Sequence, residues 1–316
     1  MVKYILKRVG QSMVSVFIIV FAVFMLLRLM PTEGYFTRDD YINMSEAERE
    51  MHLKEIGASG NPFELFGDFI VELSKGNLGE SHILQPHVEI VDILMEKIPY
   101  SLLFGVVSMT LSLILGLGLG ILMARYKDSF FDYMGTGYIV IVRAVPSLIY
   151  LYLLQIFITG LFGIPMMFNE RNPVTFIMPV ISLSLSSIAW YAIWLRRFMV
   201  DEKNKDYVKF ATAKGLSEGN ITVKHIFRNA LVPLVQYFPL QMLLTISGSL
   251  IIESLYGIPG MGGLLVDAIK EMDNSLVQIL VMLFSVLGVV GVLLGDVLMA
   301  FVDPRIKLHK AGKGGN

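Results

Sequence analysis

The stretch IPYSLLFGVVSMTLSLILGLGLGILMA, residues 98–124, contains 27 residues and not one charged side chain. About 20 consecutive apolar residues in an α-helix are enough to cross the hydrocarbon core of a bilayer. The stretch therefore predicts a membrane-spanning helix. Five further uncharged stretches meet the same criterion: residues 9–27, 144–169, 172–195, 229–252 and 274–295. Of these, 144–169 is expected to begin nearer Tyr133 and to end near Phe162, so that it carries Arg143.

The composition of the 316-residue chain agrees with a membrane protein, because 54% of it is hydrophobic and only 17% is charged, against about 25% in soluble domains. A formal net charge of −1 and the lack of a basic stripe predict no binding of nucleic acid. The absence of cysteine excludes disulfides and thiolate metal sites, and the five histidines have no metal-ligand spacing. We therefore predict an all-α integral membrane protein with six transmembrane helices, surrounded by lipid, with no metal site and no catalytic residue.

The distribution of charge predicts the orientation, because lysine and arginine accumulate on the cytoplasmic side. Residues 196–228 hold eight basic and four acidic side chains, whereas residues 31–97 hold five basic and fourteen acidic ones. The chain is thus predicted to be a multi-pass protein of the cell membrane. With six spans, both termini and residues 196–228 lie in the cytoplasm, whereas residues 31–97 and a loop near 256–273 lie on the outer side of the membrane. The first apolar stretch is too long for a signal peptide and is followed by no small-residue cleavage site, so we expect it to be retained as a helix.

The external segment predicts two short helices. Ser45 and Glu48 have the spacing of a capping box, and Asn61 with Pro62 begins a second helix that ends at Gly76. Apolar side chains share one face of that second helix: Phe63, Phe66, Phe69, Ile70 and Leu73. This face is expected to lie against the membrane surface or a partner.

A polar loop, MVDEKNKDYVKFATAKGLSEGNITVKHIFRNALVP at residues 199–233, separates the fourth and fifth predicted spans. Ala211, Ala213 and Gly215 are small enough for close approach to another protein surface, and Gly215 is suited to break the loop into two helical pieces. Lys224, His225 and Arg228 are spaced to share one face of the second piece. The alternative is that the loop is only a solvated connector.

Residues 206–220, DYVKFATAKGLSEGN, and 225–233, HIFRNALVP, resemble the signature loop of bacterial ABC-importer permeases of the oligopeptide/dipeptide branch. IIESLYGIPGMGGLLVDAI at 251–269 and GDVLMAFVDPRIKL at 295–308 resemble the same branch, as do SKGNLGES at 74–81 and IPYSL at 98–102. The resemblance covers nearly the whole chain. It implies the type I permease fold of ABC importers and a place as the first of two homologous permease subunits.

In that family the loop forms a coupling helix that docks into a groove of a separate ATPase subunit. The glycine of the family motif corresponds to Gly215 and its second alanine to Ala211. Three positions depart from the motif: Lys209 stands in place of its glutamate, Phe210 in place of its first alanine and Arg228 in place of its proline. The resemblance therefore assigns docking to one group of residues: Lys209, Phe210, Ala211, Ala213, Gly215, Leu216, His225 and Arg228.

ATP chemistry is expected in partner subunits, because the chain contains no GxxxxGK[ST] phosphate-binding loop. The run GLGLG at 116–120 and the pair Gly291 and Gly295 are expected to be helix-packing faces. The chain itself is thus expected to be no enzyme and to bind no cofactor, while ATP and Mg are bound by one or two ABC ATPase subunits. The other implied partners are the second permease, which completes a heterodimer, and an extracytoplasmic peptide-binding protein.

Polar residues in the fifth predicted span recur every four residues, at Gln241, Thr245, Ser249 and Glu253, and on one helix they would form a sloped stripe. The stripe either lines the translocation path or bonds neighbouring helices, and the serines of the fourth span at 182, 184, 186 and 187 are weaker candidates for the path. Arg143 is also a candidate for the path. Its alternatives are an ion pair with Asp296, contact with a substrate carboxylate, and snorkelling to the interface.

These observations divide the chain into residues 1–97, an N-terminal transmembrane helix with an extracytoplasmic segment, a permease core at 98–303 with five transmembrane helices, and a cytoplasmic tail at 304–316. The predicted function is that of a permease subunit that forms half of the path of an ATP-driven importer of oligopeptides or dipeptides. One alternative is the same class of transporter with nickel or a glycoside as cargo. Another is a gradient-driven secondary transporter, for which we find no internal repeat and few carboxylates along the path.

Overall fold

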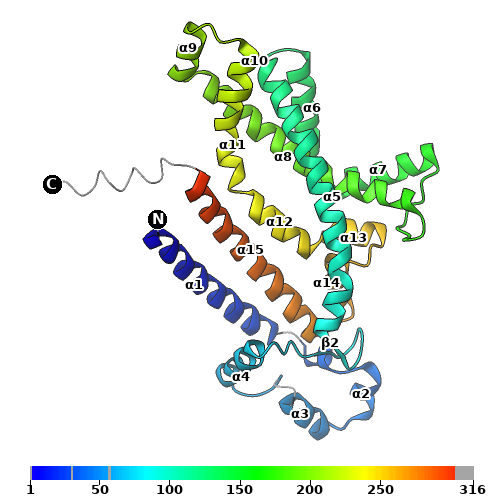
Figure 1. Ribbon diagram of the computed structural model, residues 1–316. Coiled ribbons are helices and arrows are strands. Elements are labelled where there is room, and N and C mark those ends of the chain that lie inside the picture. The colour runs from blue at the N-terminus through cyan, green and yellow to red at the C-terminus, as the bar shows by residue number, and fades with distance from the viewer. Residues whose placement is uncertain (1, 30, 56–57, 303–316) are drawn as a thin grey trace, which may run out of the picture. The chain divides into compact units, whose positions relative to one another are not determined.

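The computed structural model describes residues 2–29, 31–55 and 58–302, and within them the chain is almost entirely helical (Figure 1). The predicted cytoplasmic tail at 304–316 lies outside the described residues. The all-α membrane fold expected from the apolar stretches is confirmed.

Four helices are long and apolar enough to cross a membrane on their own: α1 (Val2–Leu27), α5 (Ile90–Arg125), α8 (Ile177–Lys203, preceded by the turn η2 at Pro173–Phe176) and α15 (Asn274–Val302). Three bent pairs pass the same test together: α6 (Phe130–Ala144) with α7 (Ser147–Phe162), the stretch Glu218–Val235 with α12 (Phe238–Ser247), and α13 (Leu250–Tyr256) with α14 (Met261–Lys270). The described residues thus hold four to seven candidate spans, and the count of six stays a prediction.

The pair α13 and α14 shows that the predicted loop near 256–273 is mostly helical, while its external location stays a prediction. Most of that range is helical, and the two helices meet at an angle of 84° after a left-handed residue, Gly257 (φ +67°). Each helix is too short to be recognised by an 18-residue apolar criterion, which explains why the sequence suggested a loop.

The segment between α1 and α5 carries the small elements η1 (Thr32–Tyr35), α2 (Arg38–Asn43), α3 (Glu46–Glu55), α4 (Pro62–Ser74) and a short hairpin of β1 (Glu80–Ser81) and β2 (Val88–Glu89). The predicted capping box is present, because the Glu48 carboxylate accepts from the Ser45 backbone N–H at 2.7 Å. The start of the second helix is also confirmed, since the Asn61 side chain accepts from the backbone N–H of Phe63 at 3.1 Å.

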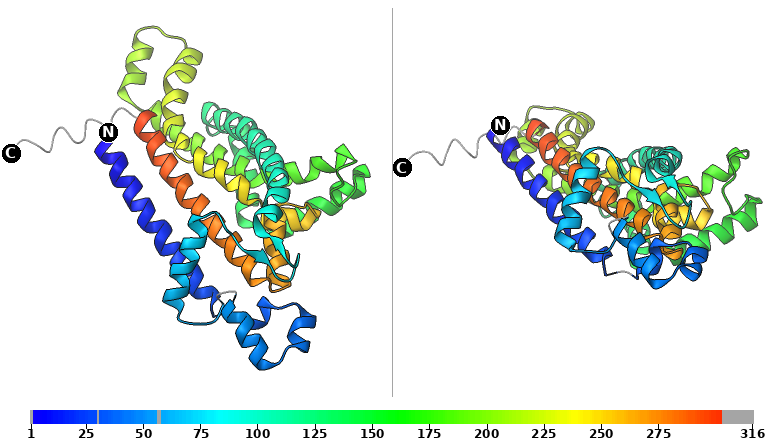
Figure 2. Two further views of the ribbon diagram at one scale, coloured as in Figure 1. Left: turned by 60° about the horizontal axis from the view of Figure 1, so that its bottom comes forward. Right: turned by 90° about the horizontal axis from the view of Figure 1, so that it is seen from below.

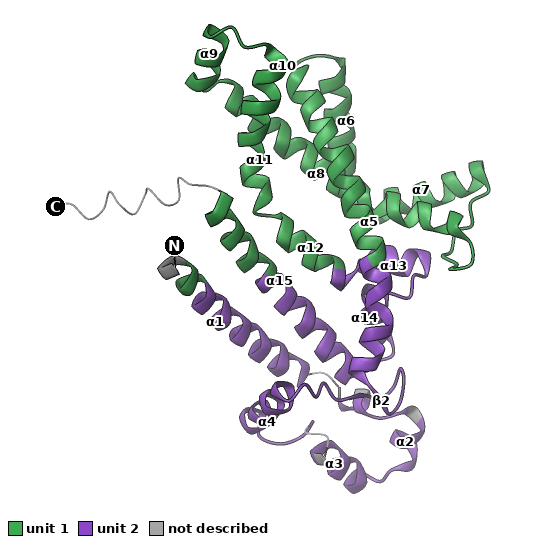
Figure 3. Cartoon of the chain, in the orientation of Figure 1, with its two compact units in different colours: residues 1–8, 103–245, 291–316 green, residues 9–102, 246–290 purple. Residues whose placement is uncertain are grey.

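The chain compacts into two units, which Figure 3 distinguishes by colour. Unit 1 comprises residues 1–8, 103–245 and 291–316, and unit 2 comprises residues 9–102 and 246–290. The long helices α1, α5 and α15 each contribute one end to each unit.

In unit 1, glycines let helices approach closely. A Cβ added to Gly116 or Gly120 would come within 3.0 Å of the α8 backbone, at the carbonyls of Ile188 and Ala192. Gly291 on α15 meets Leu240 of α12 in the same way, at 2.7 Å from its Cα. The prediction that these glycines are packing faces is therefore confirmed.

An ion pair that the sequence gave no reason to expect joins α6 to α8. Arg196 donates from Nε and Nη2 to the two carboxylate oxygens of Asp132, at 2.6 Å each, and Asp132 also accepts from the backbone N–H of Asp128 at 2.9 Å. Asp132 is 3% exposed. The fork-like, two-bond geometry is the strongest form of an arginine–carboxylate pair. It fixes the start of α6 against α8 two turns before α8 ends.

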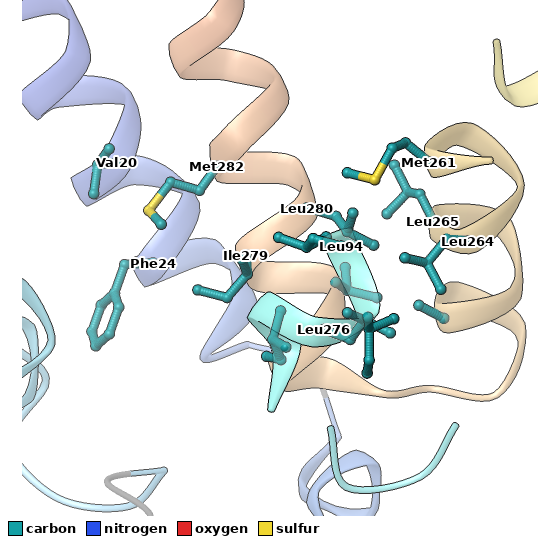
Figure 4. Packing of buried hydrophobic residues seen from close by; sticks show 14 of the residues in the cluster. Val20, Phe24, Leu94, Met261, Leu264, Leu265, Leu276, Ile279, Leu280 and Met282 are labelled. Atoms are coloured by element: carbon teal, nitrogen blue, oxygen red, sulfur yellow. The ribbon is translucent and has the colours of Figure 1, made fainter. Parts of the chain in front are cut away.

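Unit 2 has an apolar core between α1, α5, α14 and α15, built from residues such as Phe24, Leu94, Leu264 and Leu280 (Figure 4). In Figures 1 and 2 the unit 2 parts of α1 and α15 run side by side. Helix α4 adds Phe66 to this core, with ring centroids 5.1 Å from Phe21 and 5.3 Å from Phe24. The apolar face of α4, predicted to meet the membrane surface or a partner, thus packs on α1 of its own chain.

Two buried carboxylates hold the loops of unit 2. Asp273 is fully buried and accepts from the Ser81 hydroxyl at 2.5 Å, from the backbone N–H groups of Ile83 and Leu84, and from that of Leu276 in the first turn of α15. Glu253, 2% exposed, accepts from Ser101 at 2.9 Å and from the backbone N–H groups of Ser249, Gly262 and Gly263. A Cβ at Gly248 or Gly260 would collide with the Glu253 carboxylate. Glu253 therefore ties α13, the turn after it and α14 to α5.

The ion pair between α6 and α8 is predicted to stabilise the folded protein. Asp132→Asn or Arg196→Gln leaves a buried polar group without its partner, and each is expected to lower the free energy of unfolding by about 2–4 kcal/mol. The measurement is thermal unfolding of the purified protein in detergent, followed by tryptophan fluorescence. The exchanged pair Asp132→Arg with Arg196→Asp is expected to recover part of the loss. Tyr138→Phe is the matched control, because it removes a neutral contact between the same helices, the 2.6 Å bond from Tyr138 to the Leu185 carbonyl. Equal stability of all these variants would show that the pair contributes nothing.

Candidate functional site: the polar segment between α8 and α11

The polar segment predicted to couple the protein to a partner is folded and directly continuous with α8. Only Asn204 and Lys205 separate the end of α8 from α9 (Asp206–Ala213), which is followed by α10 (Glu218–Ile221), a π-helical turn at Thr222–Phe227 and α11 (Arg228–Val235). The segment can be followed at one end of unit 1 in Figure 3. The two helices are thus joined by a two-residue connection.

Gly215 lies between α9 and α10 and has a left-handed backbone (φ +79°). The predicted break between two helical pieces is therefore confirmed. A Cβ at this position would meet no atom within 4 Å. The requirement for glycine thus comes from the backbone conformation and not from a lack of space within the chain.

The inner face of the segment packs on its own unit. Val208, Ala211, Ile221 and Ile226 are buried, and they share an apolar cluster with Leu195 and Met199 of α8. Ala211, expected to offer a small surface to another protein, is only 6% exposed and lies in this cluster. Its small size is therefore explained by packing within the chain.

The outer face exposes apolar side chains in an otherwise polar segment. Phe210 is 63% exposed, Leu216 is 42% exposed and Val223 is 64% exposed, and the Lys214 ammonium lies 4.5 Å from the centre of the Phe210 ring. Lys209 and Ala213 are also exposed, and Lys209 pairs with Asp206 at 2.9 Å. Exposed apolar side chains mark a protein interface where they form a contiguous patch, so these three residues are the candidates for one.

The π-helical turn at Thr222–Phe227 changes the expected arrangement of the basic residues. Its hydrogen bonds run over five residues, so the α-helical spacing argument for Lys224, His225 and Arg228 does not carry over unchanged, and a shared face stays a prediction. Lys224 and Arg228 are exposed and His225 is half-buried. Single π-helical turns occur frequently at functional sites, and nothing in the composition of TVKHIF signals one.

The predicted polar stripe does not lie on one helix. The chain breaks after α12 at Gly248 (φ +66°), so that Gln241 and Thr245 belong to α12 whereas Ser249 caps α13 and accepts from the backbone N–H of Ile252 at 3.3 Å. Glu253 is buried in its own hydrogen-bond cage. The continuous stripe was wrong because the spacing argument assumed an unbroken helix over 229–252. A path-lining role for Gln241 and Thr245 stays a prediction, and Thr245 Oγ1 already bonds the Met242 carbonyl at 2.7 Å.

The expected partner of Arg143 is also wrong. Asp296 pairs with Arg8 at 3.2 Å and accepts from the Gln236 amide at 3.0 Å, while Arg143 is exposed near the end of α6. Arg8 comes from the far end of the sequence, which is why the spacing of spans did not reveal it. Of the weaker candidates in α8, Ser184 is buried and bonds the Val180 and Ser108 carbonyls, and Ser186 bonds the Tyr150 hydroxyl at 2.8 Å.

Comparison with known proteins places this arrangement in a family. Residues 116–308, more than half of the chain, match the family model of the "Binding-protein-dependent transport system inner membrane component". This range contains α6 to α15 and the whole polar segment.

Individual relatives agree with the family match. The oligopeptide transport system permease protein AmiC of Streptococcus pneumoniae serotype 4 is 36% identical over 219 residues, which are 67% of this chain and 43% of AmiC. OppB of Haemophilus influenzae, an oligopeptide transport system permease protein, is 30% identical over 97% of this chain and all of its own length. The dipeptide transport system permease protein DppB of Lactococcus lactis is 30% identical over 98% of this chain and all of its own length.

The chain thus spans less than half of the length of AmiC but the full length of OppB and DppB. The family match and the apolar helices together make it a multi-pass membrane protein. The chain belongs to the family of inner membrane components of binding-protein-dependent transport systems.

Proposed function

We propose that this chain is the permease subunit of an ATP-driven importer of oligopeptides or dipeptides, and that its polar segment docks on an ATPase subunit. The observation that carries the proposal is the outer face of the segment, where Phe210, Leu216 and Val223 are exposed on helices joined directly to α8. The names of the relatives, which are peptide transport system permeases, support the cargo. These names give no support to nickel or a glycoside.

The complete transporter would contain a second permease, one or two ATPase subunits that bind ATP and Mg, and an extracytoplasmic peptide-binding protein. In this arrangement both termini and the polar segment face the cytoplasm, and this chain supplies half of the path. Closure of the ATPase subunits on ATP would move the docked α9. That motion reaches α8 through the two residues between the helices and reaches α6 through the Arg196–Asp132 ion pair.

The proposed function is tested by reconstitution. The chain is expressed with its genetic neighbours, and the purified complex is placed in lipid vesicles with the peptide-binding protein and ATP. We expect ATP-dependent accumulation of a radiolabelled tripeptide and no accumulation when the ATPase cannot hydrolyse ATP. Accumulation driven by an ion gradient without ATP would instead support a secondary transporter.

The orientation is testable with single cysteines, because the chain has none of its own. Glu50 and Glu218 have side chains that are 62% and 77% exposed, so a cysteine at either position is accessible to a reagent on its side of the membrane. A membrane-impermeant thiol reagent added to intact cells is expected to label Glu50→Cys but not Glu218→Cys. Both should react after the cells are opened, which controls for reactivity. The reverse pattern in intact cells would invert the topology.

Gly215 provides a test of docking. A valine at a left-handed position is strained by about 1–3 kcal/mol, so Gly215→Val should displace α9 from α10 while membrane insertion is retained. We expect either a loss of ATPase subunit from the purified complex or a fall of about tenfold in the stimulation of ATP hydrolysis by loaded binding protein. The matched control is Gly219→Val. Gly219 likewise has open space around its Cα, but its φ lies outside the left-handed region, and this variant should keep full stimulation. Equal behaviour of the two variants would make Gly215 a connector residue.

A further inference from the structure

Unit 2 contains a cavity of about 780 Å³ that the transport mechanism described above does not use. Its wall comes from the end of α1, from Tyr35, from α3 and α4, from the loop that holds the β1–β2 hairpin, and from the first turns of α15. In the proposed topology it opens on the extracytoplasmic side, where cargo arrives. Its volume is within the range of about 300–1,000 Å³ that is usual for small-molecule sites.

Two buried polar atoms in the wall of this cavity make no hydrogen bond of regular geometry, and both can donate. Tyr35 is 6% exposed and Gln278 is 8% exposed, and both line the cavity together with Arg28. Arg28 Nε and the Tyr35 hydroxyl are buried, and within the described part of the chain neither makes a hydrogen bond of regular geometry, although the guanidinium and the hydroxyl lie close enough to interact with each other. A buried donor left without an acceptor costs about 1–3 kcal/mol. Arg28 and Tyr35, which form the floor of the cavity, would therefore be stabilised by a bound acceptor.

Arg28 is held by a contact with an aromatic ring and lines the cavity. Its guanidinium lies 4.4 Å from the centre of the Phe24 ring, and a cation stacked on a ring keeps its N–H groups directed outward in the plane. No described carboxylate pairs with it. A guanidinium with a free edge presents two parallel donors, which match the two oxygens of a carboxylate.

The acidic residues of the cavity lie on its exposed rim. Glu72 is already paired with Lys75 at 2.7 Å, and Glu80 lies 3.8 Å from His87. Asp68 is exposed and lines the cavity as well. The lining thus offers Asp68 as an acceptor, beside Lys54 and the already paired Glu72, and apolar side chains such as Leu65, Phe69 and Leu78 stand in the same wall. This distribution suits a ligand with a carboxylate at one end, an ammonium at the other and apolar groups between.

We propose that the cavity is a binding site for a short free peptide, whose C-terminal carboxylate is held by Arg28 and Tyr35 and whose amino terminus faces the acidic rim. A single oxyanion would fill only a small part of 780 Å³, whereas a peptide satisfies the floor, the apolar wall and the rim together. The inference rests on the proposed function, since it takes peptides to be the cargo. It adds that the membrane subunit itself recognises the free carboxylate.

The test uses the intact complex in phosphatidylcholine nanodiscs without the peptide-binding protein, with equilibrium dialysis of labelled trialanine as the measurement. The parent is expected to bind trialanine free acid, and trialanine amide at least about tenfold more weakly, because the amide lacks the charge that Arg28 recognises. Arg28→Gln should weaken binding of the free acid about tenfold and remove the difference between acid and amide. Arg28→Lys keeps the charge but loses the paired N–H donors of the guanidinium, so its affinity for the free acid should lie between those of the parent and Arg28→Gln.

The matched control is Arg49→Gln. Arg49 is also stacked on an aromatic ring of unit 2, 4.5 Å from the centre of Tyr41, but its Nε donates to the Met44 carbonyl and it does not line the cavity. It should bind trialanine like the parent. The inference is overturned if the parent does not bind trialanine, if it binds acid and amide equally, or if Arg28→Gln binds the acid like the parent. Uptake by the parent complex with its binding protein is measured on the same preparation. Uptake without cavity binding overturns this inference alone, whereas no uptake of any peptide overturns the proposed function.

Discussion

A carboxylate in apolar surroundings must be met by donors from its own chain, and this requirement organises both units of the molecule. Four carboxylates are buried among the described residues: Asp132, Glu253, Asp273 and Asp296. Each accepts from at least two groups, and for all four a donor lies more than 60 residues away in the sequence. Burying an ion is costly unless its partners are complete, so each cluster fixes the segments that provide its donors. In a chain with only 17% charged residues, these few polar clusters select one packing among many that apolar helices would allow.

Some of the same clusters also hold helices of unit 1 closely together. Asp132 and Arg196 join α6 to α8 near the polar segment, and the glycines of α5 bring it within contact of α8. A block of three helices therefore ends in α9, with two residues between them. Bends lie elsewhere, at the α6–α7 junction (111°) and between α11 and α12 (46°).

Much of this could be predicted from the sequence, because membrane helices follow from local composition. Uncharged stretches located every long helix, Ser45 and Asn61 located two helix starts, and Gly215 located the break in the polar segment. These features depend on residues near one another along the chain. The family resemblance of residues 206–270 added the functional interpretation, and the match over 116–308 confirms the family.

Two kinds of structural feature could not be predicted from the sequence: contacts between residues far apart along the chain, and the point at which a helix ends. The stripe from Gln241 to Glu253 required one continuous helix, and the left-handed Gly248 divides it. Glycine inside an apolar stretch gives no sign of whether it packs, as Gly116 does, or turns the chain, as Gly248 does. Asp296 pairs with Arg8, and Asp273 receives Ser81, over separations that no periodicity records. Asp273 could still have been found in part, since an aspartate directly before an apolar helix is a common cap, and its Oδ1 accepts from Leu276. Its second role, the anchoring of the β1–β2 loop through Oδ2, needs the three-dimensional fold. A buried acid that caps one helix therefore has a second oxygen to be accounted for, and in this protein that second oxygen identifies the long-range contact.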